Sequence, residues 1–269
     1  MTVRYDWFKG EDRKRQLETF VSETRKARFG KDSMPEAEKE NWVRRHFDSV
    51  AAKYDLMNTL LSFGIHHIWK RQAVAMMGLT RGDSVLDVCG GTGDLSDLAD
   101  KKVGPSGKTV LFDINRAMIE AGRQKRSAAG NYRQIACVQG NAEILPFPAE
   151  SFDAAMVGFG IRNLTHMERG FRQIYRVLKP GGKFMCLEFS KPASPWFRAL
   201  YDFYSFNIMP LLGAFIAGNP RAYTCLPETI RMFPQPEELS KILTKIGFCH
   251  MRFSRLTNGI AVVHTGVKP

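Results

Sequence analysis

Cysteine is scarce in this chain, and so are the spacings that bind metal ions. The five cysteines form no C-x-x-C pair, and most lie in apolar runs, which predicts reduced, buried thiols in a cytoplasmic protein. The neighbouring His66 and His67 are not helically spaced, so no metal site is expected. These absences argue against a disulfide framework and a zinc module.

Long apolar runs are absent as well. The most apolar stretch, Trp196–Gly218, is interrupted by Arg198 and Asp202, which predicts no membrane-spanning helix. The N-terminal residues lack the apolar core of a signal peptide, and their acidic side chains argue against a transit peptide. We therefore expect a globular protein, and 269 residues with 44% apolar composition suffice for one large core.

Acidic side chains are outnumbered, 27 against 39 basic ones, which gives a net charge of +12. Such a balance is typical of proteins that bind nucleic acid or an anionic membrane, and it also occurs on plain basic surfaces. The basic residues are scattered among acids rather than gathered in a strip with stacking aromatics, so no nucleic acid is expected as a partner. An anionic membrane surface and a merely basic exterior both stay open.

A glycine loop is the most informative feature that is present. Within Ser84–Asp94, a short apolar strand precedes three glycines, which let the backbone turn tightly and approach a ligand. These are Gly90, Gly91 and Gly93. Leu95–Asp100 resumes at helical spacing, so the loop leads into a helix N-terminus that favours an anionic ligand group. The pattern predicts a cofactor site.

The loop departs from two common nucleotide motifs. Ser96 stands where a dinucleotide fingerprint places its third glycine, and no Gly-Lys-Ser/Thr follows as it does in a P-loop. The remaining common interpretation is S-adenosylmethionine (SAM), with Asp87 and Asp94 placed to offer negative charge to its ammonium or sulfonium group.

Polar residues also end the next two predicted strands. Asp113 lies about twenty residues past the loop, where a carboxylate accepts hydrogen bonds from ribose hydroxyls. Asn141 and Ala142, followed by Glu143, end the third strand, and ligands of open α/β sheets bind beyond such carboxyl ends. We expect these residues at the adenine edge. Asp113 alone does not separate SAM from NAD, and loop capping stays an alternative for each acidic residue, Asp87 included.

The alternation of apolar strands with helical stretches from 84 to 190 predicts an α/β fold with a doubly wound parallel sheet. Residues 41–80 are predicted to form helices, and 1–40 a charged N-terminal extension. Lys179–Gly182 is expected to end a helix and turn into a strand, and Thr257–Gly259 is a strong hairpin signal. Strands are expected near 84–88, 109–113, 135–139, 153–158 and 183–188, with two more between 248 and 266.

Several segments together resemble one enzyme family. Asp87–Asp94 and Tyr175–Gly182 recur across many SAM methyltransferases. More specific are Tyr54–Asn58, Phe159–Asn163 and Leu187–Pro192. From about residue 43 onward the chain is similar to the ubiquinone/menaquinone biosynthesis C-methyltransferase family. The resemblance implies a Rossmann-like class I methyltransferase fold in one domain over 41–269, with a mostly parallel seven-stranded sheet and an antiparallel final strand pair.

The same resemblance implies the reaction and its ligands. The donor would be SAM, and the acceptor a prenylated quinol, demethylmenaquinol or 2-polyprenyl-6-methoxy-1,4-benzoquinol, in menaquinone or ubiquinone biosynthesis. Thr92, Asp113, Asn141 and Ala142 match the cofactor positions of the family. A membrane-borne substrate suits peripheral association at the inner face of the membrane. A homodimer and a quinone-biosynthesis assembly are both left open.

Methyl transfer to carbon needs an electron-rich ring, an in-line approach and removal of a ring proton. After the fourth strand, Arg162 is expected to stabilise phenolate charge and, with Asn163, to hold a water that relays the proton. A loop salt bridge is the alternative for Arg162. Tyr54 carries a hydroxyl on an apolar ring, which suits a place beside cofactor or substrate.

An aromatic-rich segment follows the fifth strand. Pro195–Gly218, within an insertion near 195–230, is predicted to form helices that cover the substrate, with room for a polyprenyl tail. Tyr201 and Tyr204 are the candidates to meet the quinol head. Plain core packing is the alternative, since aromatic stripes usually lie in cores.

The chain departs from the family pattern at a few positions. Gly158 stands where the family commonly has a serine that touches the cofactor. Tyr223–Leu226, with Cys225, replaces a usual Tyr-x-Tyr-Leu, and Gly218–Pro220 differs from a usual acidic neighbourhood. Two alternatives therefore stay beside the methyltransferase: an NAD-dependent oxidoreductase with a degenerate loop, which Ser96 disfavours, and a non-catalytic SAM-fold subunit of a quinone-synthesis assembly.

Overall fold

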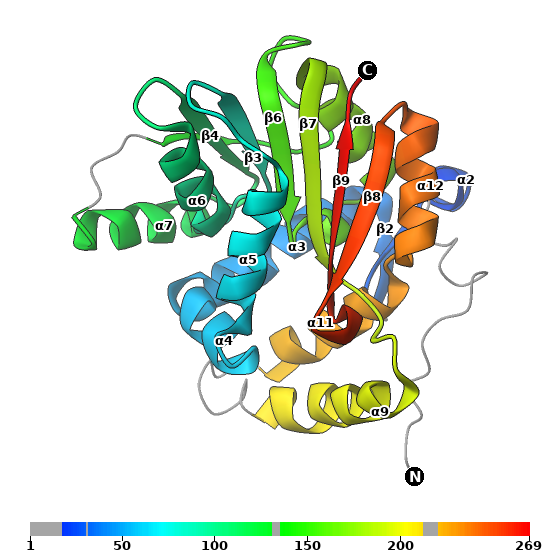
Figure 1. The fold of residues 1–269 in the computed structure, drawn as a ribbon. Coiled ribbons are helices and arrows are strands. Elements are labelled where there is room, and N and C mark those ends of the chain that lie inside the picture. Colours follow the sequence, from blue (N-terminus) through cyan, green and yellow to red (C-terminus); the bar gives the residue numbers. More distant parts are fainter. Residues whose placement is uncertain (1–17, 31, 131–134, 212–219) are drawn as a thin grey trace.

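The protein is described by a computed structural model that covers residues 18–30, 32–130, 135–211 and 220–269 (Figure 1). Its centre is a seven-stranded sheet in the order β5-β4-β3-β6-β7-β9-β8. The strands are β3 Ser84–Val88, β4 Lys108–Asp113, β5 Ala136–Gln139, β6 Phe152–Gly158, β7 Leu178–Phe189, β8 Cys249–Leu256 and β9 Ala261–Val267. In this order the first five strands, from β5 through β4, β3 and β6 to β7, pair in parallel, whereas β9 is antiparallel to both of its neighbours. The predicted mostly parallel sheet with an antiparallel final pair is confirmed.

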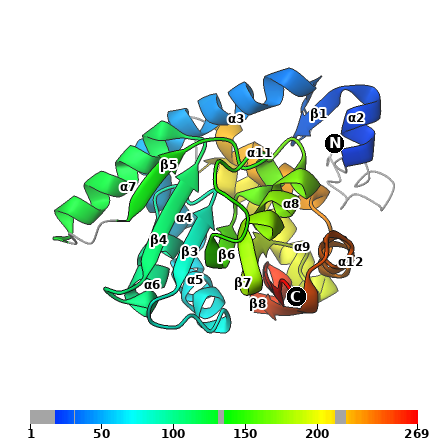
Figure 2. The same cartoon turned by 90° about the horizontal axis from the view of Figure 1, so that it is seen from above.

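Helices cover both faces of the sheet because alternate strand residues are apolar on each side (Figure 2). Leu86 and Phe184 pack against Phe171 of α8 and against α12. Val85 lies on the other face and packs against Trp69 of α5 and against α6. The helices that flank the sheet are α5 Ile65–Met76, α6 Asp94–Val103, α7 Arg116–Ala128, α8 Met167–Val177 and α12 Pro236–Ile246.

The N-terminal part packs on this body. Its elements are α2 Glu18–Thr24, β1 Lys26–Phe29, β2 Asp32–Pro35 and α3 Glu36–Val50, and β1 pairs with β2 in a small antiparallel sheet. Phe29 and Met34 bury their side chains against Val43 of α3 and against Cys225 of a later helix, α11 (Pro220–Met232). The boundary expected near residue 40 falls inside α3, while residues 1–17 of the predicted extension lie outside the described residues.

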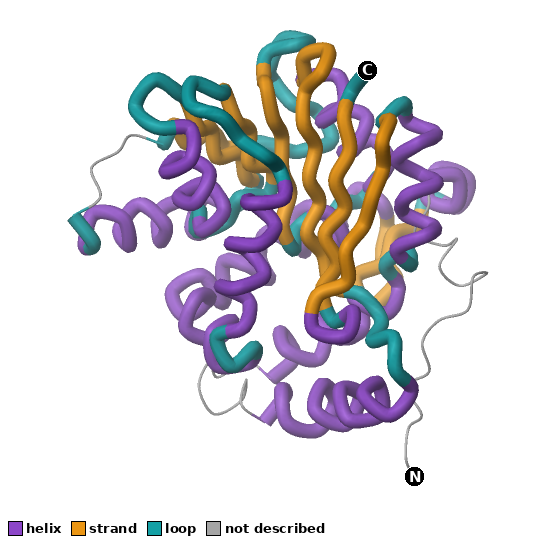
Figure 3. Tube along the Cα trace, viewed as in Figure 1, coloured by secondary structure: helices purple, strands orange, loops and turns teal. Residues whose placement is uncertain are grey.

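The carboxyl ends of the parallel strands face a group of helices at the bottom of Figure 1 (Figure 3 separates helices from strands). A 3₁₀ turn, Ala51–Lys53, leads into α4, and a π-helical turn, Tyr204–Ile208, follows α9. The helices are α4 Tyr54–Leu61, α9 Pro195–Phe203 and α11 Pro220–Met232. Over the described ranges, no helix combines the length and apolar character needed to cross a membrane.

Two turn predictions have different outcomes. Thr257–Gly259 joins β8 to β9 with Asn258 at φ 55°, so the predicted hairpin is confirmed. Lys179–Gly182 was expected between helix and strand. Instead α8 ends at Val177 and β7 already begins at Leu178, because Leu178 pairs with β6 before a register shift displaces the following residues.

Candidate active site

The glycine loop, residues 89–93, joins β3 to α6 and lies directly on the strand ends. Gly91 and Gly93 have φ values of 55° and 85°, in the left-handed region that glycine tolerates. A Cβ added at Gly90 would lie 2.8 Å from Leu111 Cγ and 3.1 Å from Asp87 Oδ2. Glycine at position 90 therefore lets the loop pack closely on Leu111 and Asp87, and Gly90 and Gly91 line the cavity described below.

Asp113 ends β4 beside this loop. Its Oδ2 accepts a hydrogen bond of 2.9 Å from the Gly91 amide, and its Oδ1 accepts one of 2.7 Å from the Asn115 amide. Burial raises the pKa of Asp113, and these amides oppose the shift. Asp113 lines a small cavity of about 90 Å³ together with Asn141 and Ala142. Three residues predicted to hold the nucleoside are thus brought together.

Asp87 is fully buried under the loop. Its Oδ2 accepts a 2.6 Å hydrogen bond from Ser96 Oγ, while Oδ1 has no partner among the described residues. Burial, and next the nearby Asp113, raise the pKa of Asp87 to about 7, although the Ser96 hydrogen bond opposes them. Asp87 lines the large cavity, and its Oδ1 is a buried acceptor without a hydrogen bond from the described residues.

Asp94 and Thr92 belong to an ion network that fastens the loop to surrounding helices. Asp94 accepts hydrogen bonds of 2.6 Å from both Lys70 and Lys125. Lys125 also donates to Asp55 of α4 at 2.8 Å, and Asp55 accepts a 2.7 Å bond from Thr92 Oγ1. Burial raises the pKa of Asp94, but the two lysines outweigh it and hold the pKa below its usual range. The negative charge of Asp94 is therefore already compensated.

His66 and His67 lie near this network, and their donor atoms lie within 4.8 Å of one another and of Asp94. Such a group can in principle hold a metal ion, which the adjacency of the two histidines did not suggest. The carboxylate oxygens of Asp94 are bound by Lys70 and Lys125, however, and His66 Nδ1 lies 2.7 Å from Ser62 Oγ. His67 Nε2 lies 3.4 Å from Thr59 Oγ1, so both histidines contact hydroxyl groups beside the ion network.

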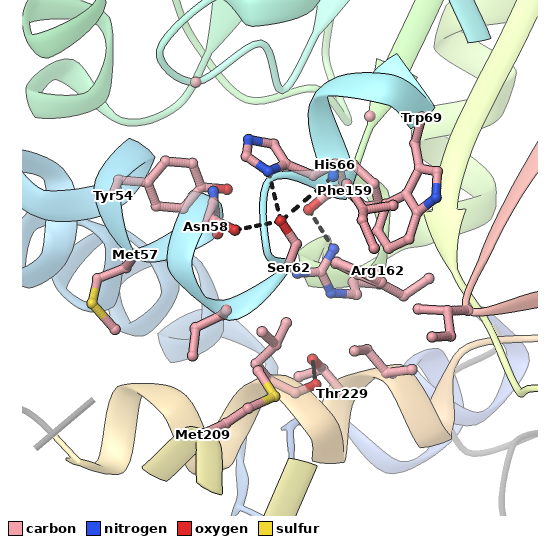
Figure 4. A pocket seen from close by; sticks show the side chains of 18 of the residues that line it. Tyr54, Met57, Asn58, Ser62, His66, Trp69, Phe159, Arg162, Met209 and Thr229 are labelled. Carbon is pink, nitrogen blue, oxygen red and sulfur yellow. Dashed lines mark hydrogen bonds between the residues drawn. The ribbon is translucent and has the colours of Figure 1, made fainter. Parts of the chain in front are cut away.

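A cavity of about 510 Å³ extends from the glycine loop into an apolar chamber (Figure 4). Asp87, Gly90 and Gly91 form its wall at the sheet, and α4, α5, α9 and α11 form the others. Its volume suits a ligand larger than a nucleoside alone. It meets the small cavity at Gly91 and Tyr54, which line both. Apolar lining residues of the chamber include Met57, Leu61, Trp69, Phe197, Leu200 and Met209.

Arg162 and Asn163 lie in a 3₁₀ turn, Ile161–Asn163, after β6, and both line the large cavity. Arg162 Nη1 donates to Glu188 Oε1 at 2.7 Å and to the carbonyl of Phe159. Both ion-pair side chains are buried, at 7% and 2% exposure. Burial raises the pKa of Glu188, and Arg162 opposes this shift. The salt bridge held as an alternative role for Arg162 is present, on a side chain that still faces the cavity.

The three predicted tyrosines converge on the chamber. Tyr54, Tyr201 and Tyr204 all line the large cavity. Tyr204 donates its hydroxyl to the carbonyl of Leu61 at 2.8 Å, which ties α4 to the turn after α9, so its ring rather than its hydroxyl faces a ligand. Burial raises the pKa of all three.

Two glycines at the end of β6 pack closely on the glycine loop and on the helix that follows it. A Cβ at Gly158 would overlap Leu95 Cδ1, so the serine common in the family at this position requires that side chain to shift. A Cβ at Gly160 would overlap the side chain of Cys89. Cys225 lies in a core with the N-terminal sheet rather than in a cavity wall. The remaining departures, at 218–219 and the side chains of 223–224, lie outside the described residues.

Comparison with known proteins fits this geometry. A profile of the ubiE/COQ5 methyltransferase family matches residues 35–268. The chain belongs to the ubiE/COQ5 methyltransferase family. A protein of Hahella chejuensis (strain KCTC 2396) named "Ubiquinone/menaquinone biosynthesis C-methyltransferase UbiE" is 48% identical over 240 residues, or 89% of this chain and 96% of the relative. One of the same name from Pseudomonas fluorescens (strain SBW25) is 45% identical over 241 residues, or 90% and 94%.

Membership of the ubiE/COQ5 family confirms the resemblance stated from sequence, and it supports neither the NAD-dependent oxidoreductase nor the non-catalytic subunit. Among solved structures, a SAM-dependent methyltransferase from Thermotoga maritima has a TM-score of 0.58 at 20% identity, covering 84% of this chain and 99% of that one. At this identity the likeness shows the class I methyltransferase fold alone.

Sequence reasoning missed several residues of the site. Glu188 lies within Leu187–Pro192, which was singled out for its resemblance but given no role. Lys70 and Lys125 carry no local pattern that separates them from other basic residues, yet they hold Asp94 from two different helices. Glu143, expected near the adenine, lines the small cavity, and its Oε1 accepts hydrogen bonds from the amides of Thr165 and His166, just before α8.

Proposed function

We propose that this chain transfers the methyl group of SAM to a ring carbon of a prenylated quinol, demethylmenaquinol or 2-polyprenyl-6-methoxy-1,4-benzoquinol. The observation that carries the proposal is one cavity of about 510 Å³ that joins the glycine loop to a chamber of apolar and aromatic side chains. Such a cavity fits a polar donor at one end and a greasy aromatic acceptor at the other. Relatives named for ubiquinone/menaquinone biosynthesis point to the same substrate class.

The donor end fits SAM in its chemistry. Gly90 and Gly91 bring backbone close to a ligand, and Gly93 leads into the N-terminus of α6, with positive φ at Gly91 and Gly93. Asp87 Oδ1, buried and without a partner in the described chain, suits the ammonium group. Asp113 would accept the ribose hydroxyls. The remaining donor-site residues would act through the adenine edge or through the ion network and are Asn141, Ala142, Thr92 and Asp94.

The acceptor end supplies orientation and charge stabilisation. Bound SAM provides an electrophilic methyl group, so the protein needs no covalent nucleophile of its own. The guanidinium group of Arg162 would donate to the phenolic oxygen as negative charge develops there. Asn163 would hold a water that carries the ring proton away, and Tyr54 would orient the ring where the two cavities meet.

The chamber would hold the rest of the acceptor. Tyr201 and Tyr204 would stack on the quinol head, because the hydroxyl of Tyr204 is already bonded to Leu61. The apolar walls from α9 and α11 would bury the first isoprene units.

Incubation with methyl-labelled SAM and short-chain demethylmenaquinol or methoxybenzoquinol tests the function. We expect the label on a ring carbon, with no added metal. Calorimetry with SAM and NAD gives the control, since binding of NAD in place of SAM would overturn the assignment, and SAM binding without turnover of either quinol would favour a subunit without catalysis.

The outer surface of the chamber supports a peripheral membrane location on the cytoplasmic side. Exposed large apolar side chains gather on the segments 51–76 and 191–211. No acidic residue of these segments is exposed, because Asp55 and Asp202 pair with Lys125 and Arg231. A basic and apolar surface matches an anionic bilayer. We call this surface the chamber rim; it consists of Lys53, Leu56, Leu60, Phe63, Ile68, Arg71, Trp196, Leu200 and Phe203.

Vesicle binding tests the rim. Leu56→Asp with Trp196→Asp adds charge at two rim positions that line neither cavity, and we expect about tenfold weaker sedimentation with phosphatidylglycerol vesicles. Ile144→Asp is the matched control, because Ile144 is 62% exposed outside the rim. Equal binding by the control and the rim variant would remove the membrane contact from the proposal.

A further inference from the structure

Glu188 is a buried acid for which the reaction proposed above has no use. It is 1% exposed at the end of β7, and its Oε1 accepts hydrogen bonds from Arg162 at 2.7 Å and from the Phe189 amide at 2.9 Å. It lines neither cavity. Whatever Glu188 contributes must therefore pass through Arg162.

The ion pair of Glu188 with Arg162 leaves two buried polar atoms without hydrogen bonds. Glu188 Oε2 and Arg162 Nε are both buried without a partner in the part of the chain that the structure describes. A glutamine at 188 could accept the same two hydrogen bonds, and a buried ion pair is weak as a source of stability. The feature that only the carboxylate supplies is its negative charge.

That charge matters because the proposed donor is a cation. Arg162 lines the same cavity as Asp87 and Gly90, and its loop lies against Cys89 of the glycine loop. The positive charge of Arg162 acts on groups in the cavity. Burial has the largest effect on the pKa of Tyr54 and raises it, whereas the charge of Arg162 lowers it. Two positive charges separated by roughly 10 Å at an effective dielectric constant of about 20 repel each other enough to weaken binding on the order of tenfold.

We propose that Glu188 is a positioning residue that neutralises Arg162, so that the guanidinium donates to the acceptor without repelling the cationic methyl donor. This inference rests on the proposed function, because it takes SAM as the donor. It makes Glu188 a determinant of donor charge selectivity, and it gives the two charges of the pair separate tasks.

S-adenosylhomocysteine provides the probe, because it lacks the methyl group and the positive charge at sulfur. We expect Glu188→Gln to raise the dissociation constant for SAM on the order of tenfold and that for S-adenosylhomocysteine less than about twofold, measured by calorimetry at pH 7.5. The double variant Glu188→Gln with Arg162→Gln should restore the wild-type ratio of the two constants.

A purely structural role predicts a different pattern. If Glu188→Gln weakens both ligands equally, or the double variant keeps the altered ratio, the inference is wrong. Glu188→Asp keeps the negative charge and is the variant to use if Glu188→Gln fails to fold. Its ratio of the dissociation constants for SAM and S-adenosylhomocysteine should stay within about twofold of wild type. A change of this ratio in favour of S-adenosylhomocysteine would overturn the inference. Failure of the wild type to bind SAM would instead refute the proposed function.

Discussion

The donor end and the acceptor end of the cavity are built in different ways. At the donor end, backbone amides and buried carboxylates are fixed by short hydrogen bonds at strand ends, as between Asp113 and Gly91. At the end proposed for the acceptor, helices α4, α9 and α11 contribute mostly apolar side chains, and the charged side chain of Arg162 lines the cavity beside them. If the two ends bind donor and acceptor as proposed, donor recognition is local and polar, whereas acceptor recognition depends on how distant helices pack.

The largest effect is expected from a substitution that disrupts the acceptor end alone. Arg162→Ala removes the donor to the developing phenolate, and we expect methyl transfer to fall on the order of 10²–10³-fold. The SAM dissociation constant should change less than about threefold, because the neighbouring Glu188 is buried and takes up a proton once Arg162 is gone. Single-turnover rates with calorimetry separate the two quantities, and a parallel loss of donor affinity would contradict the division.

A smaller effect is expected from a substitution that disrupts the donor end. Asp113→Ala removes a charged acceptor for the ribose and frees the Gly91 amide, so we expect SAM affinity to fall roughly 10–100-fold. At saturating SAM the transfer rate should stay within about threefold of wild type. Asp113→Asn is the matched control, since it keeps one acceptor oxygen. A rate defect that saturating SAM leaves in place would count against the assignment.

The smallest expected effect is a pH dependence confined to the donor end. The pKa of Asp87 is raised to about 7, mainly by burial, so the carboxyl is protonated at pH 6 and charged at pH 8. If the cation needs the charged form, SAM affinity should rise about tenfold from pH 6 to pH 8, with proton release seen by calorimetry in two buffers. Asp87→Asn should abolish this dependence.

The same group links pH to stability with the opposite sign. The folded protein keeps a proton on Asp87 up to about pH 7, whereas the unfolded chain loses it near pH 4. The free energy of unfolding without SAM should therefore fall as pH rises between these values, relative to Asp87→Asn. A flat difference between the two proteins over this range would show that Asp87 is charged in the folded state.

The donor end could be predicted because its signals are local in sequence. Gly90, Gly91 and Gly93 follow their strand closely, Asp113 ends β4 and Asn141 follows β5, so sheet topology alone brings them together. Strand periodicity also gave the sheet and its final hairpin.

The acceptor end could be predicted only in part. Arg162 and Glu188 are 26 residues apart in the sequence and belong to the ends of two different strands. Tyr204 and Leu61, which share a hydrogen bond, are 143 residues apart. Such contacts are set by tertiary packing, for which one sequence holds no periodic signal. The resemblance named the segments, but the partner of each side chain emerged from the fold.

Gly160 constrains how such an enzyme can change its substrate. Because a carbon atom added at Gly160 would overlap Cys89, contact between two loops fixes the spacing of the glycine loop and the loop of Arg162. If these loops hold the methyl donor and the acceptor as proposed, new ring substituents or longer tails are accommodated by exchanging residues on helices α4, α9 and α11, while the spacing of the two loops stays unaltered. Diversification is thereby directed to one side of the reaction centre.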